Sequence, residues 1–112
     1  MNIDLNRDLT SLNLALDALD EWIVVVDAAA KIQFINLPYA QFLGIKREAS
    51  YGCYVVDVIE NTRMHFVIKS GQEELSKLQE VRGRHMITNR YPIRQAGKVI
   101  GAIGFVLYLY WC

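Results

Sequence analysis

Residues 99–111 read VIGAIGFVLYLYW, a run of thirteen residues without a charge in a chain of 112. The run is shorter than the roughly 20 apolar residues that a membrane-spanning helix needs. Val, Ile, Phe and Tyr favour strands, and Gly101 and Gly104 would weaken a helix, so the composition predicts a strand. Because apolar residues occupy both parities, we expect both faces of this strand to be covered and the strand to lie at the centre of its sheet.

Two further strands are predicted just before this run. Residues 77–82 form the first, with Gly83 at the turn, and residues 84–94 alternate with a period of two. The odd positions of the second strand are expected to face the core. They are His85, Ile87, Asn89, Tyr91 and Ile93. The even positions, which include Arg84, Thr88 and Arg90, are expected to face water.

The N-terminal part of the chain predicts an amphipathic helix followed by a hairpin. Leucines recur at spacings of four and three, as on one face of a helix. They are Leu5, Leu9, Leu12, Leu16 and Leu19. This seam has two open interpretations: it covers the protein's own sheet, or it pairs with its copy in a homodimer. Residues 22–26 and 31–35 then read as the two strands of the hairpin.

The middle of the chain predicts several short helices. Asn36 is placed to cap the first of them, and Gly44 is placed to end it. Residues 46–50 and 55–59 each suggest one further helical turn. Thr62 is expected to cap the last helix, which ends at Ser70-Gly71. Its inward face would carry Met64, Val67 and Ile68.

The predicted order is a helix, a strand hairpin, short helices and three strands. Strands separated from a helical middle indicate an α+β fold with an antiparallel sheet. The length suits one domain, residues 1–112, which we divide into an N-terminal helix over residues 1–20 and a core over residues 21–110.

Composition excludes several classes of function. Twelve basic and twelve acidic side chains cancel, which removes the electrostatic case for nucleic-acid binding by this segment. The first residues do not form a signal peptide, so we expect a cytoplasmic protein without a membrane partner. Cys53 and Cys112 have no metal-binding spacing, and no catalytic motif is present, so neither a metal site nor an enzyme is expected.

Four stretches, taken in order, resemble a PAS domain: residues 22–27 (WIVVVD), 32–36 (IQFIN), 39–44 (YAQFLG) and 97–101 (GKVIG). The resemblance implies a signal-sensing domain with a five-stranded antiparallel sheet flanked by short helices, and it puts residues 99–110 at the centre of the sheet.

Residues 60–65 (ENTRMH) look most like the sensor domains of bacterial enhancer-binding, nitrogen-regulator-like transcriptional activators. In those proteins an ATPase module and a DNA-binding domain follow the PAS domain. Many PAS domains finish with Asp-x-Thr at the start of a signalling linker. Residues 106–110 read VLYLY instead, so the resemblance does not extend to the usual output connection.

A small-molecule site is the function that the residues favour most. The first turn of the helix after Thr62 has unpaired N–H groups, and Arg63 and His65 add donors suited to an anion. Asn89 and Tyr91 lie on the strand face that is expected to be buried. These four residues predict a pocket between helix and sheet for a small anionic metabolite, such as an amino or organic acid.

Two alternatives stay open beside this ligand site. In the first, Arg63 pairs with Glu60 or Asp57, and Asn89 bonds to nearby backbone, so that all of them are structural. In the second, the chain is a ligand-free module for homodimerisation or protein interaction through the leucine seam.

No cofactor is expected. Flavin-binding PAS relatives carry a cysteine in an Asn-Cys-Arg-Phe pattern, whereas residues 61–64 read NTRM, and Thr62 in the cysteine's place excludes a flavin adduct. Haem-binding relatives use a histidine on the long helix. His65 is the candidate here, but its place in the first turn next to Arg63 does not favour haem.

Overall fold

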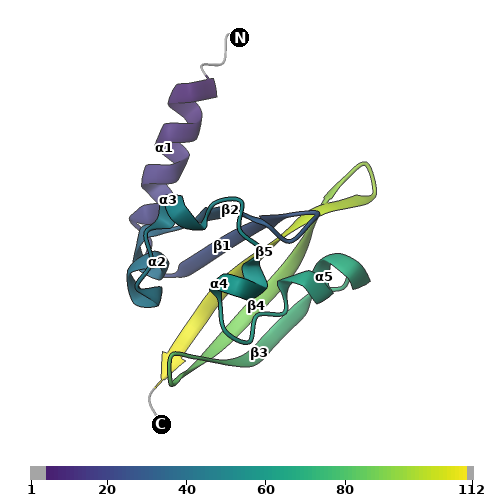
Figure 1. Cartoon of the computed structure of the whole chain (residues 1–112). Coiled ribbons are helices and arrows are strands. Elements are labelled where there is room, and N and C mark those ends of the chain that lie inside the picture. Colours follow the sequence, from purple (N-terminus) through teal and green to yellow (C-terminus); the bar gives the residue numbers. More distant parts are fainter. Residues whose placement is uncertain (1–4, 111–112) are drawn as a thin grey trace.

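Five strands form one antiparallel sheet in a computed structural model that describes residues 5–110, with side chains described over residues 11–107 (Figure 1). The strands run in the order β2-β1-β5-β4-β3 across the sheet. Their bounds are β1 (Trp22–Asp27), β2 (Ile32–Ile35), β3 (Glu74–Val81), β4 (Arg84–Gln95) and β5 (Lys98–Tyr110). The apolar run is β5, and it lies at the centre of the sheet. The predicted five-stranded antiparallel α+β fold is confirmed.

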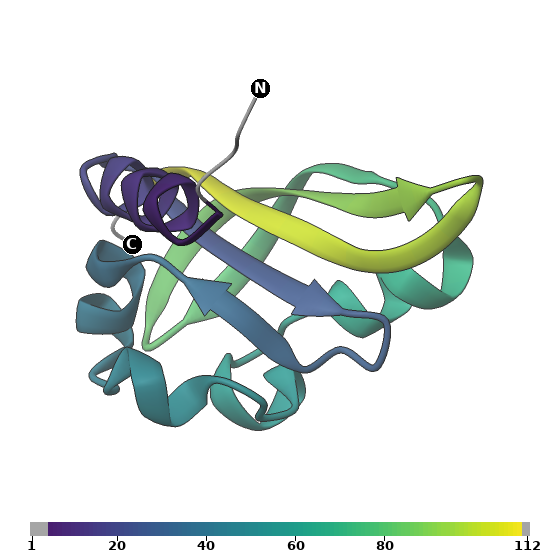
Figure 2. The same ribbon diagram turned by 90° about the horizontal axis from the view of Figure 1, so that it is seen from above.

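The helices are α1 (Leu5–Asp17), α2 (Leu37–Leu43), α3 (Arg47–Ser50), α4 (Val55–Val58) and α5 (Met64–Ser70). In Figure 2, α2 to α5 gather on one side of the sheet. The core lies between these helices and the strands, and its fully buried members include Ile32, Ile35, Val55, Val67 and Met86. Each of the predicted short helices is present.

The two glycines of β5 leave room for neighbours that come very close. A Cβ atom at Gly101 would overlap the backbone carbonyl oxygen of Val26 on β1. A Cβ atom at Gly104 would lie 3.1 Å from the sulfur of Met64, which belongs to α5. The glycines therefore let β1 and α5 approach the central strand, and they do not mark a turn.

The expectation that both faces of β5 are covered is wrong. Ala102 and Val106 are buried on the face that the helices cover. On the opposite face, Ile103 and Phe105 are half-buried and Leu107 is 51% exposed. The apolar composition correctly predicted a central strand, but α2 to α5 cover one face of the sheet only.

The expected orientation of β4 is also wrong, because the even positions face the core. Met86, Thr88 and Arg90 are buried, whereas Asn89 and Tyr91 are half-buried on the opposite face. The register explains the direction, since Arg90 lies opposite Gly104, and Gly104 faces α5. The alternation of residues along the strand predicted that the arginines at even positions face water, because the pattern gives no sign that Arg90 bonds to Glu74 and Gln79 in the core.

Asn36 does not cap α2 with its side chain. Its amide is fully buried and bonds elsewhere: Nδ2 donates to the carbonyl oxygens of Leu16 (3.1 Å) and Glu21 (2.7 Å), and Oδ1 accepts from the backbone N–H of Ile23 (2.9 Å). One side chain thus ties the end of α1 to β1 and α2. The start of α2 is capped instead by Asp17, whose Oδ1 accepts from the N–H of Leu37 (2.9 Å).

The leucine seam of α1 does not cover the sheet at Leu12, which is 55% exposed, and α1 extends beyond the strands in Figure 1. Leu19 is also exposed and Leu16 is half-buried. The side chains of Leu5 and Leu9 lie outside the described residues. Over residues 5–110, no helix has the length and the apolar character that crossing a membrane requires.

Candidate functional site

Arg90 is a buried cation in the middle of the sheet. Its side chain is 2% exposed and faces α5. A buried charge is stable only when it is paired and hydrogen-bonded. Arg90 Nη1 donates to Glu74 Oε1 (3.0 Å), and Nη2 donates to Gln79 Oε1 (2.7 Å). Burial lowers the pKa of Arg90, an effect that Glu74 opposes, and a guanidinium still keeps its proton in a protein.

The partners of Arg90 are themselves held by further bonds. Glu74 accepts from Arg63 at both of its oxygens, with Nε at 3.0 and 3.1 Å and Nη2 at 2.9 Å. These bonds from Arg63 are the main reason that the pKa of Glu74 is lowered. Gln79 Nε2 donates to the carbonyl oxygen of Glu60 (2.8 Å). Arg63 therefore pairs with Glu74, not with Glu60 or Asp57 as the structural alternative expected.

The charges of this cluster do not cancel. Arg63 and Arg90 contribute two positive charges, and Glu74 contributes one negative charge, so the three side chains carry a formal charge of +1. Arg63 is half exposed, so water screens its charge, whereas Arg90 is buried. The positive charge that Glu74 does not compensate is therefore least screened by water at Arg90.

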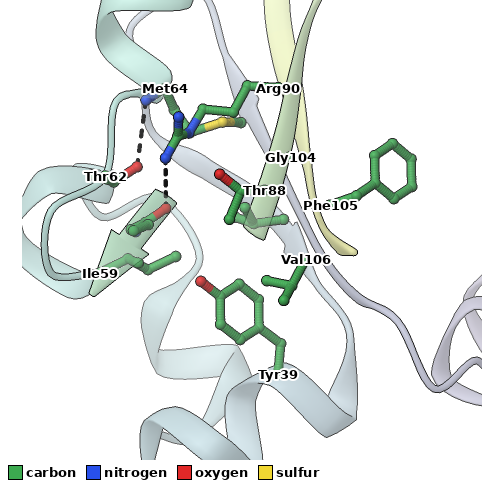
Figure 3. A pocket seen from close by; sticks show the side chains of 11 residues that line it. Tyr39, Ile59, Thr62, Met64, Thr88, Arg90, Gly104, Phe105 and Val106 are labelled. Atoms are coloured by element: carbon green, nitrogen blue, oxygen red, sulfur yellow. Dashed lines mark hydrogen bonds between the residues drawn. The ribbon is translucent and has the colours of Figure 1, made fainter. Parts of the chain in front are cut away.

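A cavity of about 20 Å³ lies beside Arg90, between the helices and the sheet (Figure 3). Its apolar wall includes Val24, Ile59, Met64 and Val106, and its polar side chains are Tyr39, Thr62, Gln79, Thr88 and Arg90. A cavity of this volume holds about one water molecule. It is therefore a small space in the core that apolar and polar side chains line together.

Tyr39 brings a second polar group to this cavity from α2. Its side chain is 3% exposed, and its hydroxyl points into the cavity in Figure 3. The indole of Trp22 stacks on its ring at 5.4 Å between centroids. Burial raises the pKa of Tyr39, so the hydroxyl stays neutral. Among the described residues, the hydroxyl has no hydrogen-bond partner.

Met64 forms the most adaptable wall of the cavity. Its thioether lies against Gly104, which has no side chain to exclude it. Its backbone N–H approaches Thr62 Oγ1 at 3.4 Å, but the residue at the N-cap of α5 is Arg63, so the predicted capping by Thr62 is only partly right. Methionine side chains are flexible and adapt to irregular spaces, so this wall can move at low cost.

The four residues predicted to contact a ligand do not meet at one site. Arg63 lies at the exposed end of the cluster, with its guanidinium 4.6 Å from the ring centre of Phe66. His65 is half-buried and meets Tyr54 edge-on; burial, and then the nearby charge of Arg63, lower its pKa. Asn89 donates to the Tyr91 hydroxyl (3.1 Å) on the far face of the sheet.

Arg90 and Tyr39, which both line the cavity, were not predicted as site residues from the sequence. One feature of the sequence could have indicated that Arg90 is buried. Met86 lies on the same face of the strand as Arg90, and Met86 is more apolar than His85 on the other face. Nothing in the sequence indicated that Glu74 and Gln79 would reach Arg90 from β3. Over residues 11–107, whose side chains the structure describes, no cluster of three or more histidine, cysteine or acidic side chains could hold a metal ion.

Comparison with known proteins places this arrangement in a family. A sequence model described as the PAS fold matches residues 10–107. A curated protein of Halalkalibacterium halodurans, named "Probable C4-dicarboxylate sensor kinase", is 27% identical over 95 residues, which are 85% of this chain and 18% of that protein. The chain thus spans less than a fifth of this relative.

Solved structures of other proteins share the fold. The Escherichia coli DhaR(N)–DhaL complex superposes with a TM-score of 0.75 at 21% identity, over 94% of this chain and 36% of the other. VqmA bound to DPO, whose other structures come from Vibrio cholerae, gives a TM-score of 0.64 at 20% identity, over 87% of this chain and 56% of the other. PAS domains are generally sensory modules without catalytic activity. On the family match and the shared fold, the chain belongs to the PAS fold family.

Proposed function

We propose that this chain is the sensor domain of a bacterial signalling protein and that it binds a small anionic molecule at Arg90. One observation carries the proposal: a buried guanidinium faces a cavity, in a cluster whose charges leave +1 uncompensated. An anion in the cavity would balance this charge and accept charge-assisted hydrogen bonds from the guanidinium. The output module is that of a transcriptional regulator or a sensor kinase.

Known relatives support the chemical class of the ligand. The curated relative is named for C4-dicarboxylates, which are small organic acids, and the VqmA structure holds the small molecule DPO. The predicted class, an amino or organic acid, agrees with the name of the curated relative, and VqmA shows only that a domain with this fold occurs in a protein bound to a ligand. The cytoplasmic location and the absence of nucleic-acid contact stay predictions.

The cavity has to widen before it can accept an organic acid, since its present volume of about 20 Å³ suits one water molecule. Met64 supplies the movable wall. In this proposal Arg63 acts through Glu74, while His65, Asn89 and Tyr91 lie outside the lining of the cavity.

Binding at Arg90 would also change the cluster that extends to the surface. An anion competes with Glu74 for Arg90, and Glu74 would then rely on Arg63, which precedes α5. A ligand shifts a conformational equilibrium only if it binds one arrangement better than the other. In the free domain Glu74 bonds to both Arg63 and Arg90, and in the bound domain it would bond to Arg63 alone, so the two arrangements differ in their affinity for the anion.

A thermal-shift experiment with succinate, acetate and glycolate tests the proposal. A binding acid should stabilise the domain by about 2.7 kcal/mol at a hundredfold excess over its Kd. We expect the shift to disappear in Arg90→Gln and to persist in Arg94→Gln, a matched control at an exposed position of the same strand. Glu74→Gln should strengthen binding, because it raises the charge of the cluster.

Two outcomes of the thermal-shift experiment would refute the proposal. If none of the three acids shifts the melting temperature, or if Arg90→Gln responds as the unmodified chain does, Arg90 is a structural residue only.

Self-association is a second candidate function, favoured by the exposed leucines of α1. Leu12 is 55% exposed and Leu14 is 65% exposed, although both are large and apolar. We expect a homodimer at micromolar concentration in sedimentation, and we expect Leu12→Asp to weaken it. Asn13→Asp adds the same charge at the adjacent exposed position and serves as the control. A monomer at these concentrations would contradict this function.

A further inference from the structure

The cavity offers a ligand a single charge. Arg90 alone is charged among the described side chains that line it, and Glu74 is the one carboxylate that pairs with Arg90 among the described residues. One carboxylate group neutralises the remaining charge of the cluster. A second carboxylate on the same molecule would face Ile59, Met64 and the other apolar side chains without a cation, and burying an unpaired charge is unfavourable.

Among the described polar side chains that line the cavity, Tyr39 is the one whose side chain makes no hydrogen bond. The other neutral polar side chains already have partners: Gln79 bonds to Arg90 and to Glu60, Thr88 Oγ1 donates to the carbonyl oxygen of Lys77 (3.1 Å), and Thr62 Oγ1 faces the N–H of Met64. The Tyr39 hydroxyl can both donate and accept. A buried polar group of this kind favours a ligand that can bond to it.

Arg90 and Tyr39 approach the cavity from opposite ends in Figure 3, with Thr88 and Ile59 between them. The ring of Tyr39 cannot easily withdraw, because Trp22 stacks on it and also lies 4.3 Å from the ring centre of Phe42. Met64, whose side chain is flexible, is the wall that would move on binding. The cavity that both groups line has a volume of only about 20 Å³ and is bounded by apolar side chains, which favours a molecule of a few atoms.

We infer that the ligand is a small monocarboxylate that also carries a neutral hydroxyl or carbonyl oxygen, with its carboxylate on Arg90 and its neutral oxygen on Tyr39. This inference rests on the proposed function and narrows it. Tyr39 is then the residue that determines specificity, and it favours a hydroxy or oxo acid over the plain acid of the same length. A dicarboxylate is disfavoured, even though the curated relative is named for that class.

The test is calorimetric titration of the chain with pairs of acids that differ by one oxygen. The pairs are glycolate with acetate and lactate with propionate, and succinate represents the dicarboxylates. One neutral hydrogen bond is worth about a fivefold difference in Kd. We expect glycolate and lactate to bind about fivefold more tightly than their partners and more tightly than succinate. The advantage should vanish in Tyr39→Phe and persist in Tyr54→Phe, which removes an exposed hydroxyl.

The outcomes separate this inference from the proposed function. If succinate binds as tightly as glycolate, or if the advantage of glycolate survives in Tyr39→Phe, the inference is overturned while binding that depends on Arg90 still supports the proposed function. If none of the five acids binds, both fail.

Discussion

Glu74→Gln is the substitution that tests the buried cluster most directly. The Glu74 carboxylate accepts three bonds from Arg63 and one from Arg90. Removing one partner of a fully buried ion pair costs about 3–5 kcal/mol. The cost should be smaller here, because Glu74 is 17% exposed and glutamine keeps one acceptor oxygen. A hydrogen bond to a charged group contributes about 1.5–3 kcal/mol, so we expect a loss of about 2–3 kcal/mol.

Urea unfolding at pH 7, followed by tryptophan fluorescence, measures this loss. A domain of this size has a stability of about 5–15 kcal/mol, so the variant should remain folded. Glu73→Gln removes the same charge from the adjacent exposed position, and we expect it to change stability by less than about 0.5 kcal/mol.

The pH dependence gives a second, independent measurement. The pKa of Glu74 is lowered in the folded protein, chiefly by its bonds from Arg63. The contribution of Glu74 is therefore fully present above its unfolded pKa of about 4.3, and it is lost as the pH falls through the lower folded value. The gap between the unmodified chain and Glu74→Gln should narrow below pH 4. A gap as small as that of Glu73→Gln at pH 7, or one that does not change in acid, would refute this account of the cluster.

Three further substitutions test the packing around the site, each by denaturant unfolding. Met64→Ala should destabilise the domain by about 2–5 kcal/mol, because it enlarges a buried cavity; a loss below about 1 kcal/mol would show that the wall collapses onto Gly104. Gly101→Ala should abolish stable folding, since its Cβ would overlap the Val26 carbonyl, and a stable variant would contradict the close approach of β1. Asn36→Ala removes three bonds of a buried amide and should cost about 2–4 kcal/mol; a change within about 0.5 kcal/mol would mean that α1 is not held there.

The parts of the fold that depend on local pattern were predictable. The apolar run of β5 predicted its central place, and Gly44 predicted the end of α2, where it has a φ of 72°. The role of Asn36 was not predictable, because its partners include Leu16, twenty residues earlier in the chain. Local pattern favours a cap at that position, and only the fold, which brings the end of α1 and the start of β1 to Asn36, shows that the amide has three other bonds.

The candidate site could not be predicted from the sequence either, because its residues also come from distant parts of the chain. Arg63 was predicted to contact an anionic ligand or to pair with Glu60 or Asp57, whereas its partner is Glu74, which lies eleven residues away at the start of β3. Tyr39 belongs to an apolar helix face, and nothing in its neighbours indicates that its hydroxyl ends in a cavity. Each of these contacts joins elements whose relative position is set by the whole sheet.

Arg90 is a charged residue at a core position, where an apolar residue is usual, and this departure supports a functional role. A buried ion pair contributes little net stability, and well-packed apolar residues of similar volume often serve as well or better. Met86, its neighbour on the same face of β4, is the apolar residue that such a position usually has. Sequences depart from such rules mainly where function requires it. Glu74 and Gln79 together make Arg90 tolerable without neutralising the cluster, and that remaining charge is what an anionic signal can use.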